Sequence, residues 1–165
     1  MGNDILRQKA EVIENIDEAL AKTANNMLVA LKEGKGVGLA GPQVAVMKRI
    51  FVTHVQGDVP RIFINPSLLE TSGETAKMEE GCLSVPGIFA DVVRAKMIKI
   101  QAWNEKGKPF TLEAGGILAR VILHELDHLE GILFLDRLSE VKRNRLTAKF
   151  EKQAKTRALD AMKRG

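Results

Sequence analysis

Hydrophobic residues in this chain repeat with a helical period near both ends and with a strand period between them. Apolar residues recur every three or four positions over 15–33, which predicts a helix, and the glycine-rich stretch 34–38 predicts a tight loop after it. Runs rich in β-branched and aromatic residues at 50–55, 61–65 and 97–103 predict strands. The first hundred residues are therefore expected to form one helix followed by a sheet.

The helical period returns in the last third of the chain. A turn at 104–107 is expected to lead into a further strand at 109–112. A second helix is predicted over 116–129, ending at residue 129 or 130 with Gly131 as its C-terminal cap. A third helix is predicted over 139–163, where apolar residues again fall on one stripe.

The composition is that of a globular protein. Of 165 residues, 45% are apolar and 28% charged, enough to bury one domain-sized core. The order of elements predicts an α+β fold, a single domain over 1–165 with short antiparallel strands around a central helix and a C-terminal helix. There is no membrane-length apolar run and no secretory signal, and the one cysteine, Cys82, cannot form an internal disulfide. These features predict a cytoplasmic protein.

Positive charge is concentrated at the end of the chain. The net charge is +4, but 139–165 carry nine Lys or Arg against three acids, so the remaining 138 residues are at −2. A basic helix is most often a solvated surface, and contact with nucleic acid is the alternative. With aromatic residues at 4%, stacking platforms for single strands are not expected.

The clearest chemical signal is the run His124-Glu125-Leu126-Asp127-His128 in the second predicted helix. Residues four apart share one helix face, so both imidazoles can reach one metal ion while Glu125 touches a water on that ion. The flanking residues are apolar on most sides, and polar groups buried there are costly unless a metal or another group pairs with them. The motif therefore predicts a hydrolase that activates water with a metal, and leaves the substrate open.

A catalytic metal site of this type needs a third protein ligand. His54 lies in a predicted strand and is expected to be an ordinary strand residue, while Asp127 and Glu130 are too near the histidines on the same helix. Cys82 lies in a stretch bracketed by Gly and Pro, which can aim a side chain away from a sheet. Its alternative role is a small buried hydrophobe, and we favour the ligand.

Three segments, in order, resemble the three motifs of peptide deformylase of the bacterial or organellar type. They are GVGLAGPQ at 36–43, EGCLS at 80–84 and HELDH at 124–128. A looser similarity runs over about 4–138, so the resemblance covers most of the chain. Each motif alone is moderately specific, and the three together at these spacings are strong.

The resemblance implies an enzyme that removes the formyl group from the N-terminal formylmethionine of nascent polypeptides, with 1–165 as its catalytic domain. A metal-bound water would attack the formyl carbon, with Glu125 as general base and then general acid. The Gln43 side-chain amide and the Leu83 backbone N–H would stabilise the oxyanion. The implied metal ligands are Cys82, His124 and His128.

The resemblance also implies the ion and the way the peptide is held. The cofactor would be one divalent metal, with Fe(II) in the most active form, although a Cys-His-His set also takes Zn, Ni or Co. Backbone groups of Val37, Gly38 and Gly81 would hold the peptide in an extended pose. A methionine-sized pocket is expected beside the metal helix, with candidate walls from Ile117, Val121 and the stem of Arg120.

The implied partners are few. Besides the formylmethionyl peptide, we hypothesise from its charge alone that the basic segment 139–165 docks on ribosomal RNA, near emerging chains, with a solvated helix face as the alternative. Contacts with a membrane or with DNA are not expected, and the protein is expected to be a monomer.

Two residues depart from the family pattern. Leu123 stands where the family usually has Gln, immediately before the first histidine, and Gly41 stands where Ala is more common. We expect the first change to remove an outer contact of the site and the second to loosen the loop that carries Gln43. Neither removes a chemical group from the site.

Two other functions share part of the pattern. A small zincin-like metallopeptidase would have the helix motif but a third His or a downstream Glu as ligand, so Cys82→Ser would leave its metal in place. A non-catalytic metal- or nucleic-acid-binding protein would keep every function after Glu125→Gln. These two substitutions separate the three hypotheses.

Overall fold

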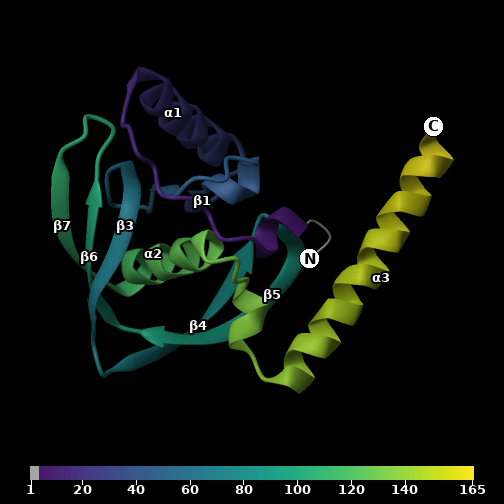
Figure 1. The fold of residues 1–165 in the computed structure, drawn as a ribbon. Coiled ribbons are helices and arrows are strands. Elements are labelled where there is room, and N and C mark those ends of the chain that lie inside the picture. The colour runs from purple at the N-terminus through teal and green to yellow at the C-terminus, as the bar shows by residue number, and fades with distance from the viewer. Residues whose placement is uncertain (1–3) are drawn as a thin grey trace.

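The computed structural model describes residues 4–165 as helices and antiparallel strands (Figure 1). The α-helices are α1 (Glu18–Glu33), α2 (Gly116–Leu129) and α3 (Glu140–Arg164), and the 3₁₀ helices are η1 (Asp4–Arg7), η2 (Gly41–Val44) and η3 (Phe134–Arg137). The strands are β1 (Gly38–Ala40), β2 (Ile50–Thr53), β3 (Arg61–Thr71), β4 (Thr75–Cys82), β5 (Val85–Ala95), β6 (Met97–Trp103) and β7 (Pro109–Gly115). The predicted α+β class is confirmed, because the strands surround α2 and a C-terminal helix follows.

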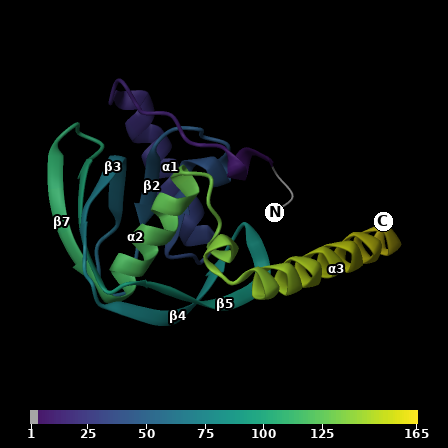
Figure 2. The ribbon, with the colours of Figure 1, turned by 60° about the horizontal axis from the view of Figure 1, so that its bottom comes forward.

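The strands form two separate antiparallel units. Five of them make one sheet in the order β1-β2-β3-β6-β7, and β4 pairs with β5 in a hairpin inserted between β3 and β6. In Figure 1 this hairpin passes below α2, and in Figure 2 its strand β5 lies next to the start of α3. The hairpin thus brings the turn after Cys82 close to the central helix.

The sequence analysis missed the hairpin. In β4 the alternation is short, with only Ala76 and Met78 set between polar residues, and β5 contains Pro86 and Gly87, which are depleted from strands. Pairing between the two strands, and packing of their inner face on α2 and η3, overrides these weak local signals. The missed strands matter because β4 ends at Cys82.

Other predicted boundaries moved by a few residues. Helix α1 begins at residue 18 because Asp17 caps it, its Oδ1 accepting a hydrogen bond from the Leu20 N–H at 2.9 Å. Strand β3 continues past its predicted end at Asn65. A register shift between Ile64 and Ser67, with a φ of 49° at Asn65, accommodates Pro66 within the strand. The predicted end of α2 is confirmed, with Gly131 in the left-handed region just beyond it.

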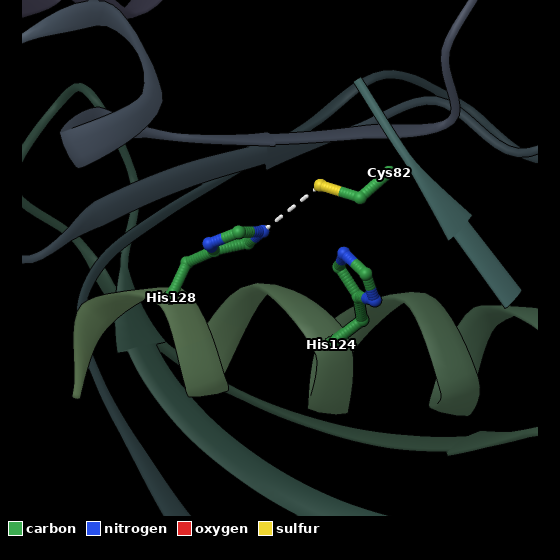
Figure 3. Close-up of side chains that lie close together, drawn as sticks. All are labelled: Cys82, His124 and His128. Atoms are coloured by element: carbon green, nitrogen blue, oxygen red, sulfur yellow. Dashed lines mark hydrogen bonds between the residues drawn. The ribbon is translucent and has the colours of Figure 1, made fainter. Parts of the chain in front are cut away.

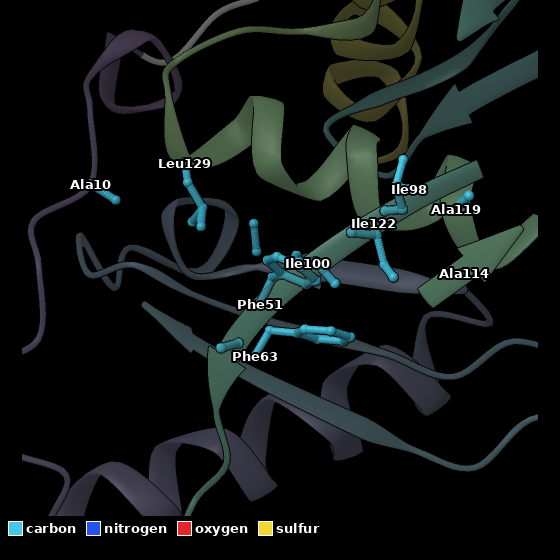
Figure 4. Packing of buried hydrophobic residues seen from close by; sticks show 11 residues of the cluster. Ala10, Phe51, Phe63, Ile98, Ile100, Ala114, Ala119, Ile122 and Leu129 are labelled. Atoms are coloured by element: carbon cyan, nitrogen blue, oxygen red, sulfur yellow. The ribbon is translucent and has the colours of Figure 1, made fainter. Parts of the chain in front are cut away.

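The main core lies between α2 and the five-stranded sheet (Figure 4). Phe51 and Phe63, on neighbouring strands, stack with ring centroids 4.5 Å apart. Ala119 and Ile122 of α2 pack in the same cluster as Ile100 of β6, and all three are fully buried. Helix α2 is therefore held rigidly by its apolar face while its other face carries the histidines.

Helix α3 extends away from the rest of the molecule (Figure 2). Its only buried residue is Leu146, which packs near its first turns against β5 and η3. Farther along, the predicted apolar stripe has no cover, since Met162 is 79% exposed. Within residues 4–165, no helix combines the length and apolar character that a membrane span requires.

Candidate active site

Three predicted ligands meet where β4 ends beside α2 (Figure 3). The potential ligand atoms of Cys82, His124 and His128 all lie within 4.8 Å of one another, and Cys82 Sγ is 3.3 Å from His128 Nε2. The four-residue spacing directs both imidazoles to the same side of α2, facing the thiol. A thiol and two imidazoles this close can share one divalent ion, and three protein ligands leave a coordination position open for chemistry.

Burial, nearby charges and hydrogen bonds shift the pKa values of the two histidines in opposite directions. Burial, followed by the positive charges of His124 and Arg94, lowers the pKa of His128 to about 3, so His128 is the neutral imidazole that metals bind. Burial would lower the pKa of His124 as well, but its hydrogen bonds with Cys82 and Glu80 raise it to about 10. The space between His124 and Cys82 thus stabilises a proton, and a metal ion would be stabilised there for the same reason.

Glu125 lies beside the ligands, enclosed between α2 and β1. A Cβ added at Gly38 would lie only 2.6 Å from Glu125 Oε1, so the strand backbone covers the carboxyl closely. Burial raises the pKa of Glu125 to about 7, against the opposing charge of His124. Within residues 4–165, its Oε2 has no hydrogen-bond partner. A carboxyl that titrates near neutrality and has an unpaired oxygen is suited to accept and return a proton.

Gln43 reaches the same place from η2. Its Oε1 accepts a hydrogen bond from the Ala40 N–H at 2.8 Å, which turns Nε2 toward the β4–β5 hairpin. There Nε2 donates to Ser84 Oγ at 3.0 Å and to Cys82 Sγ at 3.4 Å. Leu83, predicted to offer its backbone N–H, lies in the turn between these two residues. A fixed amide donor beside the thiol is placed to stabilise negative charge on a carbonyl oxygen.

A cavity of about 480 Å³ opens over these groups. Its lining holds every predicted site residue except His128, which contacts Cys82 from behind. The lining residues are Lys35, Gly36, Val37, Gly38, Gln43, Gly81, Cys82, Leu83, Pro86, Gly87, Phe89, His124 and Glu125. A larger hollow, about 750 Å³, lies beside α1 and contains none of this chemistry.

The three residues predicted to wall a methionine pocket, Ile117, Val121 and Arg120, are not among those that line this cavity. Arg120 turns under the hairpin instead, where its Nη1 donates to Glu80 Oε2 at 2.6 Å. The apolar lining comes from the loop before β1 and from the hairpin, including Phe89, which sequence reasoning missed because β5 itself was missed.

Glu80, like Phe89, lies near the site, and the sequence analysis did not predict a role for it. Its Oε1 lies 2.9 Å from His124 Nδ1. The available signal was its position two residues before Cys82, because residues two apart on a strand point to the same face. His54, in contrast, is exposed just after β2 and outside the cluster, which confirms it as an ordinary residue.

The packing of Leu123 and Gly41 explains why these two residues can differ from the family pattern. Leu123 packs against the main core cluster, so it faces away from the metal ligands. At Gly41, where a looser loop was predicted, the chain packs closely. A Cβ at Gly41 would lie 2.5 Å from the Val46 carbonyl oxygen, and the Val46 N–H donates to the Gly41 carbonyl at 2.9 Å. The glycine therefore permits a tighter turn beneath Gln43.

Gly38→Ala tests the close approach of β1 to the carboxyl. The added methyl would contact Glu125 Oε1 and lie 2.8 Å from Val121 Cγ1, so the strand or the carboxyl must move. We expect kcat/KM to fall by about 10²-fold, as for a small misplacement of reacting groups, with a stability loss of about 1–3 kcal/mol. The matched control is Gly73→Ala, where the methyl meets open space. Equal activity of the two variants would contradict this geometry.

The chain is similar over most of its length to known proteins. Residues 1–144 match the family model described as polypeptide deformylase. A peptide deformylase of Neisseria meningitidis is 47% identical over 152 residues, 91% of this chain and 90% of the relative. One from Clostridium botulinum is 48% identical over 139 residues, 84% of this chain and 93% of the relative. The crystal structure of a peptide deformylase from Legionella pneumophila matches with a TM-score of 0.89 at 36% identity, covering 96% and 94% of the two chains.

Proposed function

Because this chain belongs to the polypeptide deformylase family, it is a metal-dependent hydrolase that removes the formyl group from N-terminal formylmethionine, and we propose that the cavity above Cys82 is its active site. One observation carries the assignment: three candidate ligands, a buried carboxyl and a fixed amide donor meet in one place. The ion would be held by Cys82, His124 and His128, with Fe(II) as the native metal.

Glu125 would carry the proton through the reaction. When bound, the metal supplies Lewis-acid activation of water, whose pKa falls toward 7. Glu125 takes a proton as the water oxygen bonds to the formyl carbon, and returns it to the methionine nitrogen as the carbon–nitrogen bond breaks. The products are formate and a free N-terminal amine. The raised pKa and the unpaired Oε2 of Glu125 support both transfers.

Two donors would stabilise the charge that develops on the formyl oxygen. The Gln43 amide is already oriented by the Ala40 N–H, and it would exchange its hydrogen bond to Ser84 Oγ or Cys82 Sγ for one to the formyl oxygen. The Leu83 backbone N–H would be the second donor, from the turn that follows Cys82. Loss of one such donor typically costs about 2.7–4 kcal/mol of transition-state stabilisation.

The peptide would bind as an extended strand between β1 and the hairpin. Strand β1 is at the edge of its sheet, so one side of its backbone is available for pairing near Val37 and Gly38. Across the cavity, Gly81 lies under the Phe89 ring, where an added Cβ would be 2.5 Å from a ring carbon. The glycine leaves room for the Phe89 ring, and both residues line the cavity that the peptide would enter.

The assay that tests this proposal uses anaerobically purified protein and three peptides. We expect formate from formyl-Met-Ala-Ser, no product from acetyl-Met-Ala-Ser, and no cleavage of an internal-peptide substrate. Metal content measured on the same sample identifies the competent ion, and oxygen-sensitive activity is expected if that ion is Fe(II). Cleavage of the internal peptide would instead indicate a metallopeptidase.

We propose further that α3 docks on ribosomal RNA, with the enzyme acting as a cytoplasmic monomer. The helix extends from the body and its basic residues are largely exposed, as phosphate contact requires. Neutralising three exposed lysines of α3 should remove up to three phosphate contacts and leave kcat/KM unchanged. The three are Lys152, Lys155 and Lys163.

Cosedimentation with ribosomes at several salt concentrations checks this prediction. The slope of log Kobs against log salt should fall in magnitude by roughly 2–3 for three lost contacts. A matched triple variant on the hairpin and the β6–β7 turn should keep the original slope. It replaces Lys77, Lys106 and Lys108, which are also exposed. Equal slopes for both triple variants would rule out docking through α3.

A further inference from the structure

A buried ion network lies directly behind the candidate ligands. Arg94 of β5 bridges two acids, Glu80 of β4 and Asp127 of α2, with N–O distances of 2.6 and 2.9 Å. Arg120 forms a second ion pair with Glu80 at 2.6 Å. Arg137, the last residue of η3, forms a second ion pair with Asp127, also at 2.6 Å. Both acids and the first two arginines have side chains no more than 10% exposed. The network therefore joins α2 to the hairpin in a region that water scarcely reaches.

Glu80 contacts a candidate ligand directly. Its Oε1 is 2.9 Å from His124 Nδ1, whereas the ion pairs of Asp127 are to Arg94 and Arg137. A carboxylate can only accept, so a hydrogen lies on His124 Nδ1, and a metal ion that displaces the other proton would bind the lone pair of Nε2, on the Cys82 side. His128 has no such anchor, because its Nδ1 is buried without a hydrogen-bond partner within residues 4–165.

We propose that Glu80 is a positioning residue of the metal site, which fixes the tautomer and the ring orientation of His124. The inference rests on the ligand set proposed above. Hydrogen bonds from a carboxylate to the second nitrogen of a ligating histidine orient the ring and strengthen metal binding in other sites. Here Glu80 performs this role for His124, whereas His128 has no such partner among residues 4–165.

The arginines hold Glu80 in place from two sides. Oε2 accepts from Arg94 Nε and from Arg120 Nη1, both at 2.6 Å, and Oε1 also accepts from Arg94 Nη2 at 3.0 Å. With both oxygens occupied, the carboxylate cannot rotate away from His124. Because Glu80 and Cys82 are two residues apart on β4, the same clamp sets the distance between the thiol and the helix.

Metal binding, measured apart from activity, tests this inference. Co(II) titration of the metal-free protein reports affinity through chelator competition and ligand geometry through its visible absorption. Glu80→Gln removes the charge while keeping the shape, and Glu80→Asp keeps the charge for the arginines but draws the carboxylate back by one methylene. We expect both variants to lose about 10–100-fold in Co(II) affinity, with altered absorption bands.

Asp127→Asn is the matched control, since it removes the other acid on the same arginine. It should lower the thermal stability of the metal-free protein about as much as Glu80→Gln, while Co(II) affinity stays within about threefold of the wild type. If Glu80→Gln does not fold, Glu80→Asp decides alone. Wild-type affinity and spectrum in a folded Glu80 variant, or an equal loss in Asp127→Asn, would overturn the inference. Absence of a thiolate–Co(II) band in the wild type would instead reject the ligand set.

Discussion

Glu125→Gln is expected to lower kcat/KM for a formylmethionyl peptide by about 10²–10⁴-fold, the range for loss of a general acid–base. The amide keeps the size of the side chain, so the enclosure by β1 is preserved, but it cannot accept the proton of the attacking water. The metal content should not change, because Glu125 is not among the candidate ligands. Steady-state formate release and metal content, measured on one sample, check both expectations.

The control for this experiment lies at the end of the same helix. Glu130 caps α2 and pairs with Arg49 at 2.7 Å, with its side chain 40% exposed. Glu130→Gln should therefore change stability slightly and leave kcat/KM as in the wild type. If Glu125→Gln kept full activity as well, the proton would have to travel through another group, and the proposed mechanism would fail.

Cys82→Ser is expected to release the metal. A neutral hydroxyl is a much poorer ligand than a thiolate. The metal affinity should therefore fall by more than the roughly 10–100-fold that is lost when a hydrogen-bond partner of a metal ligand is removed. Activity should fall with metal occupancy, and excess metal should restore part of it. Metal analysis after dialysis, with the thermal midpoint of the metal-free protein, separates loss of metal from loss of fold.

His54→Ala is the matched control, because it removes the remaining histidine from an exposed position outside the cluster. Its metal content and activity should equal those of the wild type. Full metal retention by Cys82→Ser would favour a His/Glu ligand set and the zincin-like alternative. Loss of metal in both variants would indicate a general effect on stability rather than ligand loss.

The candidate site shows which features could be predicted from local sequence. His124, Glu125 and His128 share one turn of helix, and helix geometry alone places them on neighbouring faces. The C-terminal end of α2 was also predictable, because Gly131, just beyond it, adopts a left-handed conformation that glycine accepts readily. The roles assigned to Gln43, Leu83 and the glycines came from the resemblance in their motifs, not from periodicity.

The hairpin and its contacts could not be predicted in the same way. Strand β4 has few apolar residues and β5 lacks a clear alternation, and the two strands depend on pairing with each other and on packing against α2. For the same reason the sequence analysis considered only the stem of Arg120, as a pocket wall, and missed that its guanidinium pairs with Glu80, 40 positions earlier in the chain. A long side chain can reach several surfaces, and only the packed structure selects one.

The sequence by itself determined the reaction class, the metal-binding helix, the basic C-terminal helix and the α+β class, because each depends on residue types at short spacings. Only the tertiary structure decided that Cys82 lies 3.3 Å from His128 and that Glu80 clamps His124 from behind. These contacts join residues 46 and 44 positions apart. Their geometry follows from the packing of the hairpin on α2, since contacts between distant residues have no local pattern to reveal them.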